Sequence, residues 1–187
     1  MVSILSLWAP ILVAAVLVFG ASSVIHMLMP YHRKDFKKVD DEESVMDSLR
    51  ALDIPPGDYI MPFAGGPEGM RSEAFIEKVR KGPIAMITVM PEGAWLNMGP
   101  QLAQWFVYVV LVSCVAGYAA GLGLDAGAEY RTVFRMVSTV AFACYSMALM
   151  QNSIWYHRNW RQTLTTMFDG LVYALVTGGA FGWLWPS

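Results

Sequence analysis

This sequence has little charge and almost no cysteine. Only 15% of its 187 residues are charged, with 13 basic and 15 acidic side chains, whereas 56% are hydrophobic. Soluble domains have an apolar share of about 45–50%, so this composition excludes an ordinary soluble domain and indicates a membrane protein. A formal net charge of -2 provides no basic field to displace counterions from phosphates. We therefore expect no nucleic acid partner.

Motifs for catalysis are also missing. There is no Gly-x-Ser-x-Gly nucleophile elbow and no carboxylate pair on one helix face. The two cysteines, Cys114 and Cys144, lie in apolar runs without a neighbouring base. The glycine-rich stretch 63–70 is not followed by the Gly-Lys-Ser/Thr of a phosphate loop. We therefore expect no enzymatic activity and no cofactor.

What the sequence does contain is four long apolar runs, at 4–29, 101–124, about 132–152 and about 163–185. A helix of about 20 residues crosses the bilayer core, so each run can span it. A cleaved signal peptide is the alternative for the first run, but the basic segment that such peptides carry is missing. We predict an all-α integral membrane protein with four transmembrane helices. Its predicted parts are a first helix at 1–29, an insertion at 30–100 and three further helices at 101–187.

The insertion at 30–100 is the only sizeable aqueous part. One of the aspartates at 40–41 can cap a first helix, and Ser72 can cap a second. The β-branched run 84–90 is too short to cross a bilayer, and a strand needs a partner. Within the insertion, 58–63 is the one candidate for that partner. These patterns predict a small α+β subdomain that rests on the membrane.

Basic residues predict the orientation of the helices. Positively charged loops remain in the cytoplasm, and the segments 33–38 and 157–161, which fall on the same side of a four-span arrangement, are both basic. We predict a plasma (inner) membrane protein with both termini outside and residues 30–100 in the cytoplasm. Membrane lipid is an expected partner, because a basic cluster beside a span can bind anionic head groups. The residues of this cluster are Arg33, Lys34, Lys37 and Lys38.

Small residues recur every four positions on two of the spans. Such faces let helix backbones approach one another closely, so we predict that they pack against other helices of this chain or of other subunits. They are Ser113, Gly117 and Gly121 on the second span, and Gly170, Ala174, Gly178 and Gly182 on the fourth.

Asp169 is the most costly residue in the sequence, because it lies about two turns inside the fourth apolar run. An ionised carboxylate at that depth needs a partner, water or a proton. Antiparallel packing would place it level with Tyr145 and Ser146, and the polar turn before the fourth span could reach it. The predicted intramembrane polar cluster contains Asp169, Tyr145, Asn152, Gln151, His157, Arg158 and Arg161.

Three roles are open to Asp169. It can clamp two helices together by bonding an arginine or the start of a neighbouring helix. Alternatively, it can take up a proton or bind a cation on a polar path lined by Ser138, Tyr145 and Asn152. Imidazoles and a carboxylate also bind metals, and the third role is an ion site. Its ligands would come from His26, His32, His157 and Asp169, but no short-spaced pair such as His-x-x-x-His supports it, so we expect no metal.

The function that these patterns predict is that of a structural or accessory subunit. Such a subunit self-associates into a homo-oligomer or docks on a larger membrane complex, and the small-residue faces and the insertion would supply the contacts. The alternative is a small channel or proton-coupled transporter that uses Asp169.

Overall fold

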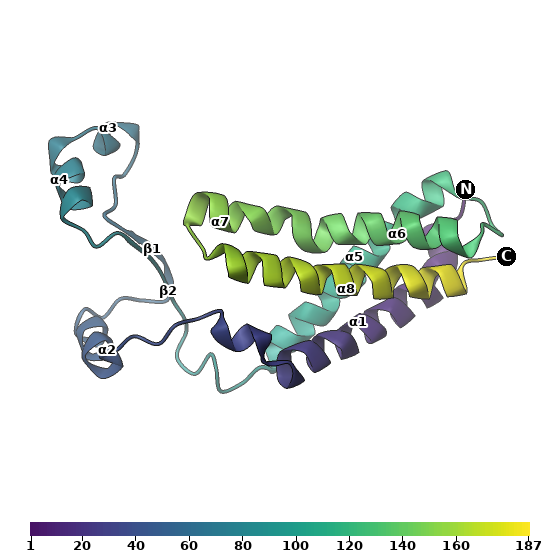
Figure 1. Ribbon diagram of the computed structural model, residues 1–187, viewed down its shortest axis with the longest axis horizontal. Helices are drawn as coiled ribbons and strands as arrows, with labels where there is room; N and C mark the ends of the chain where they lie inside the picture. The colour runs from purple at the N-terminus through teal and green to yellow at the C-terminus, as the bar shows by residue number, and fades with distance from the viewer. The chain divides into compact units, whose positions relative to one another are not determined.

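The computed structural model describes residues 1–187 and divides into two compact units (Figure 1). The first unit comprises Met1–Lys37 and Gly99–Ser187, and the second comprises Lys38–Met98. The segment 30–37 belongs to the same compact unit as the long helices. This segment contributes side chains to the candidate site.

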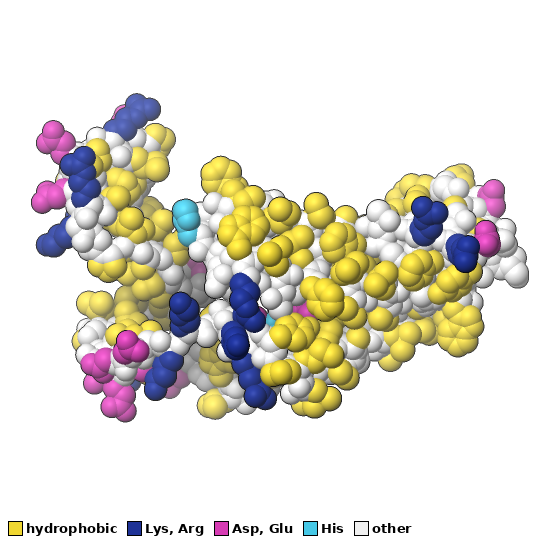
Figure 2. Space-filling model, viewed as in Figure 1, with side chains coloured by type: hydrophobic (Ala, Val, Ile, Leu, Met, Phe, Trp, Pro, Cys, Tyr) yellow, Lys and Arg dark blue, Asp and Glu magenta, His cyan; other side chains and the backbone are white.

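Four helices of the first unit are long and apolar enough to span a membrane, as predicted. They cover Ile4–Leu28, Gly99–Gly123, Tyr130–Tyr156 and Trp160–Leu184, with 25 to 27 residues each. A helix of 25 residues is about 38 Å long, which exceeds the roughly 30 Å of bilayer hydrocarbon. Figure 2 shows hydrophobic side chains over much of the visible face of this bundle, with lysines and arginines gathered toward its two ends.

The third span is interrupted, which the sequence did not predict. A single 3-10 turn separates two helices of this span, so the residues that follow the turn form a short helix of their own. The elements of the first unit, in chain order, are η1 (Ile4–Leu7), α1 (Trp8–Leu28), η2 (Pro30–Lys34), α5 (Gly99–Gly123), α6 (Tyr130–Ser146), η3 (Met147–Leu149), α7 (Met150–Tyr156) and α8 (Trp160–Leu184).

The long helices form a bundle in which α1 packs on α5 and α8, and α6 packs on the same two neighbours. Both termini lie at one end (Figure 1), where the Val2 amide donates to the Gly121 carbonyl at 3.0 Å. At the other end, the Arg161 guanidinium donates to the Tyr31 carbonyl oxygen at 3.1 Å. The segment after α1 and the turn before α8 therefore meet there.

The predicted small-residue faces pack inside this bundle. A Cβ atom on Gly178 would lie 2.0 Å from Ser138 Oγ, and one on Gly170 would lie 2.1 Å from Ser146 Oγ. Both serines belong to α6, so α6 and α8 approach more closely than any larger residue at these positions would allow. The other small residues in the same two faces are Ser113, Gly117, Gly121, Ala174 and Gly182. These faces therefore contact helices of the same chain.

The second unit has the predicted mixture of helices and strands. Strands β1 and β2 pair antiparallel with Tyr59 opposite Ile87, which confirms the predicted strand partner. The Asp41 carboxylate accepts a hydrogen bond from the Ser44 amide and caps the first helix, as expected. The elements are α2 (Glu42–Ala51), β1 (Gly57–Met61), α3 (Pro67–Met70), α4 (Glu73–Lys81) and β2 (Ala85–Val89).

This second unit has no buried side chain in any of its helices, strands or loops. Many of its large hydrophobic side chains are exposed instead. They are Val39, Val45, Met46, Leu52, Ile60, Met61, Phe63, Met70, Ile76, Ile84, Met86, Met90, Trp95, Leu96 and Met98. A domain of about 60 residues that folds alone buries about 60% of the surface of its unfolded chain. The second unit therefore lacks a hydrophobic core of its own.

Candidate functional site

Asp169 is the centre of the candidate site. It lies on α8, is 1% exposed, and both of its carboxylate oxygens have a partner. The Tyr31 hydroxyl donates to Oδ1 at 2.5 Å, and His32 Nε2 lies 2.8 Å from Oδ2. Both partners come from η2, so the carboxylate fastens the segment that follows α1 to the side of α8.

Proline explains why the chain turns back at this point. Pro30 disfavours helical backbone at the residue before it, and Met29 is extended, with φ -88° and ψ 130°. The α1 helix therefore ends at Leu28. The fixed φ of proline suits the first position of a new helical turn, and Pro30 begins η2. This change of direction carries Tyr31 and His32 toward α8.

A second carboxylate holds the other side of His32. His32 Nδ1 lies 2.6 Å from Asp35 Oδ2, and the Arg161 guanidinium donates to Asp35 Oδ1 at 3.3 Å. Arg161 occupies the first turn of α8, because the Asn159 side chain caps that helix by accepting from the Arg161 amide at 3.0 Å. The contacts therefore run from Asp169 through His32 and Asp35 to Arg161, and they join η2 to α8 at two levels.

Tyr31 is fixed as a hydrogen-bond donor in this network. Burial, together with the hydrogen bond to the Asp169 carboxylate, raises the pKa of the Tyr31 phenol above its ordinary value. The hydroxyl stays protonated at neutral pH and donates to Asp169. One oxygen of the Asp169 carboxylate is therefore held by Tyr31.

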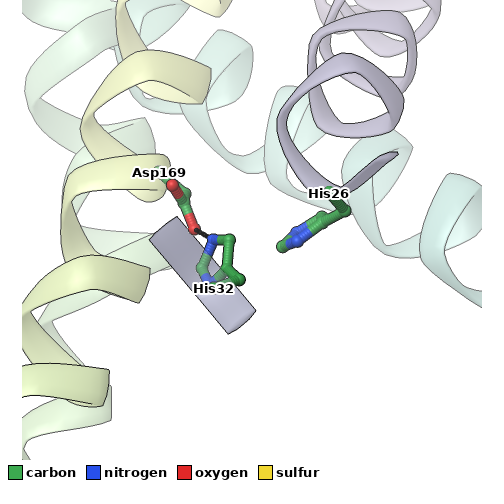
Figure 3. A group of neighbouring side chains, drawn as sticks. All are labelled: His26, His32 and Asp169. Atoms are coloured by element: carbon green, nitrogen blue, oxygen red, sulfur yellow. Dashed lines mark hydrogen bonds and ion pairs between the residues drawn. The ribbon is translucent and has the colours of Figure 1, made fainter. Parts of the chain in front are cut away.

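A second histidine faces the same place from α1. His26 lies in the last turn of α1 and is exposed. Its ring centroid lies 4.7 Å from that of His32, and its Nε2 lies 3.5 Å from the Tyr173 hydroxyl. Figure 3 shows His26, His32 and Asp169 converging from three segments of the chain. Each offers one potential ligand atom, and these atoms all lie within 4.8 Å of one another.

The arginines predicted near Asp169 do not contact it. Arg161 precedes Asp169 by eight residues, or about 12 Å along α8, and its guanidinium is used by Asp35 and by the Tyr31 carbonyl. Arg158 instead borders a separate hollow with Asn152. The clamp that holds Asp169 is therefore made by a histidine and a tyrosine, and not by an arginine.

The other predicted members of the cluster do not bond Asp169. Tyr145 is level with Asp169, as antiparallel packing predicts, because a Cβ atom on Gly170 would lie 3.1 Å from its Cβ. Its hydroxyl is buried without a hydrogen-bond partner. Gln151 and His157 are exposed. None of these residues shares a hydrogen bond with Asp169.

The polar stripe predicted on the third span does not continue the site through the bundle. The Ser138 hydroxyl donates to the Phe134 carbonyl of its own helix at 2.5 Å. Tyr173 lies one turn after Asp169 on α8. The rings of Tyr145 and Trp105 make edge contacts with the ring of Tyr173, at centroid distances of 5.6 and 5.7 Å. Aromatic side chains therefore pack together directly beyond the site.

Sequence reasoning missed Tyr31 and Asp35 altogether and treated His32 only as a remote metal candidate. One signal was present: His32 and Asp35 are three residues apart and directly follow Pro30, a spacing that places two side chains on one side of a helical turn. This spacing is a weak signal, because the basic residues around it already have a role in setting the orientation of the helices in the membrane.

The fold and the site define a class of protein: a mostly helical chain with four helices able to span a membrane, a small two-stranded insertion and a buried carboxylate bonded to histidine. Comparisons with protein-family models, with curated proteins and with solved structures find no match. The function therefore has to be inferred from the residues of this chain.

Proposed function

We propose that this chain is a non-enzymatic accessory protein of the plasma (inner) membrane, whose second unit docks on another membrane subunit or on a second copy of the chain. The observation that supports this function is the absence of any buried side chain in Lys38–Met98. A unit without a core gains stability when a partner covers its apolar side chains, by about 25 cal/mol for each Å² removed from water.

The hairpin supplies the clearest exposed apolar surface. Ile60 and Met86 lie opposite each other on β1 and β2, and they are 44% and 52% exposed. The other face of the same strands, which carries Tyr59 and Ile87, is only partly covered. Contiguous apolar surface that remains exposed marks interaction sites on proteins, so the hairpin is the expected centre of the docking surface.

The small-residue faces do not supply the contact to a partner, because the bundle uses them internally. This moves the proposed contact from the membrane helices to the second unit. The channel or transporter alternative has no comparable support, since the Ser138 hydroxyl bonds the Phe134 carbonyl of its own helix.

The proposed orientation has both termini outside and residues 30–100 in the cytoplasm. Arg33, Lys34, Arg158 and Arg161 belong to the end of the bundle opposite the termini, which is the cytoplasmic end if basic segments remain inside. The side chains proposed to bind anionic head groups are exposed. They are Arg33, Lys34, Lys37 and Lys38.

Native mass measurement after extraction in a mild detergent tests the docking. A discrete foreign subunit supports the accessory role, and a homo-oligomer supports self-assembly. A bare monomer in the extract would contradict both. The variant Ile60→Ser with Met86→Ser should remove the partner. Thr88→Ser, on the same exposed face of β2, should retain it and serves as the matched control.

A further inference from the structure

The network around Asp169 contains one residue that a clamp does not need. Asp169 fastens η2 to α8 through Tyr31 and His32, and this accounts for both of its oxygens. His26 adds nothing to that clamp, since its one polar contact is the 3.5 Å approach to the Tyr173 hydroxyl. Its ring nevertheless lies beside that of His32 and opens toward the same point as Asp169 (Figure 3).

The three side chains have the chemistry of a metal site. Two imidazoles and one carboxylate are ligands that zinc and related divalent ions bind. The ligand atoms of His26, His32 and Asp169 all lie within 4.8 Å of one another. With bonds of about 2.0–2.2 Å, ligand atoms around a tetrahedral ion are about 3.4 Å apart. To reach that spacing, the exposed His26 ring would move inward, and His32 Nε2 and Asp169 Oδ2, now 2.8 Å apart, would separate by about 0.6 Å.

The surroundings of His32 match those of a metal-bound histidine. A ligand histidine donates its other ring N–H to a carboxylate, which fixes the ring orientation and leaves the remaining nitrogen facing the ion. His32 has this arrangement, with Nδ1 2.6 Å from Asp35 Oδ2 and Nε2 2.8 Å from Asp169 Oδ2. An ion between Nε2 and Oδ2 would replace the hydrogen bond that joins these atoms.

The remaining contacts hold the ligands in place. Tyr31 bonds the Asp169 oxygen that does not face His32, and Arg161 bonds the Asp35 oxygen that does not face His32. One oxygen of each carboxylate is therefore held by Tyr31 or Arg161. The other oxygen of Asp35 faces His32, and the other oxygen of Asp169 can bind the ion. Asp169 is buried, whereas His26 is exposed, so the site has a closed side and an open side through which an ion and a fourth ligand could enter.

We propose that His26, His32 and Asp169 form a binding site for a divalent transition-metal ion such as Zn²⁺, with Asp35 positioning His32. The three ligands come from α1, η2 and α8. A bound ion ties the end of the first span to the fourth span. This inference is independent of the proposed docking, because it involves only residues of the first unit.

Cobalt binding to the full chain tests the proposal. The protein is extracted in detergent, stripped with a chelator and titrated with Co²⁺ alone, whose visible d–d absorption reports coordination directly. We expect about one Co²⁺ per chain, with the intensity of a four-coordinate site, and displacement by Zn²⁺. The absence of a saturable spectrum, or a spectrum of fully hydrated Co²⁺, would overturn the proposal.

His26→Ala is the decisive variant. Because His26 is exposed and lies outside the Asp169–His32 clamp, this variant should keep the fold of the parent chain. It should weaken Co²⁺ binding by more than the roughly 10–100-fold that loss of a residue bonded to a ligand costs. Asp35→Asn should fall within that 10–100-fold range. His157→Ala is the matched control, since His157 is also exposed but lies outside the cluster, and it should bind Co²⁺ like the parent. Equal affinity in His26→Ala and the parent, or equal losses in His26→Ala and His157→Ala, would refute the site.

Discussion

The pairing of Asp169 with His32 predicts a measurable coupling energy between α8 and η2. The perturbation is a double-mutant cycle made from Asp169→Asn, His32→Gln and the double variant. Asparagine retains the size of aspartate and can still accept from the Tyr31 hydroxyl, so the cycle compares the 2.8 Å contact between His32 Nε2 and the Asp169 carboxylate with contacts made by neutral amides. The cycle removes effects that each substitution has on its own.

The magnitude follows from the burial of the carboxylate. A hydrogen bond to a charged group contributes about 1.5–3 kcal/mol, and hydrogen bonds between membrane helices average about 0.6 kcal/mol with a maximum near 1.7. Asp169 is 1% exposed, so the expected value lies where these two ranges meet. We therefore expect a coupling energy of about 1–2 kcal/mol and a loss of about 2–4 kcal/mol for Asp169→Asn alone.

The assay is reversible unfolding of the full chain in mixed micelles, followed by circular dichroism with a chelator present. The chelator ensures that only contacts within the protein contribute. Gln151→Ala provides the baseline, because Gln151 is exposed on α7 and substitution of such a residue changes stability by less than about 0.5 kcal/mol. Additive effects of the two substitutions, with a coupling energy below about 0.3 kcal/mol, would refute the clamp.

Two further predictions concern the packing of α6 against α8 and the contact of Arg161 with the segment after α1. Gly178→Ala should destabilise the bundle by about 1–3 kcal/mol, because the new Cβ atom would lie 2.8 Å from the Phe134 carbonyl oxygen. Gly20→Ala should not destabilise it, since nothing lies within 4 Å of that position; equal losses of unfolding free energy in the two variants would contradict the packing. Arg161→Ala should cost only about 1 kcal/mol, because the arginine is 44% exposed. It should nevertheless speed hydrogen exchange of the Asp35 amide, and unchanged exchange would show that Arg161 does not hold η2.

Much of the fold can be predicted from the sequence, because membrane spans and turns are local features. The four apolar runs predict the spans to within a few residues at each end. Asp41 and Ser72 cap the two predicted helices of the insertion, since a short side chain that accepts from the backbone acts at its own position. The interruption at η3 has no such marker, because no proline or glycine lies in it.

The site was harder to predict because it depends on where the chain returns after Pro30. The basic segment 33–38 indicates topology, and this interpretation draws attention away from His32, which the backbone directs toward α8. The spacing test for metal ligands also failed to pair His26 with His32. That test assumes one helix, whereas α1 ends between the two residues. Only the packing of α1 against α8 brings both rings to Asp169.

X-ray absorption at the zinc edge tests the metal site most directly. The sample is the full chain in detergent, loaded with Zn²⁺ and freed of excess ion. The proposed site should give nitrogen or oxygen ligands at about 2.0–2.1 Å, with the outer-ring scattering of two imidazoles. This scattering should fall to that of one imidazole in His26→Ala and stay unchanged in His157→Ala. A spectrum without imidazole scattering, or one that His26→Ala leaves unchanged, would contradict the assignment of His26, His32 and Asp169 as ligands.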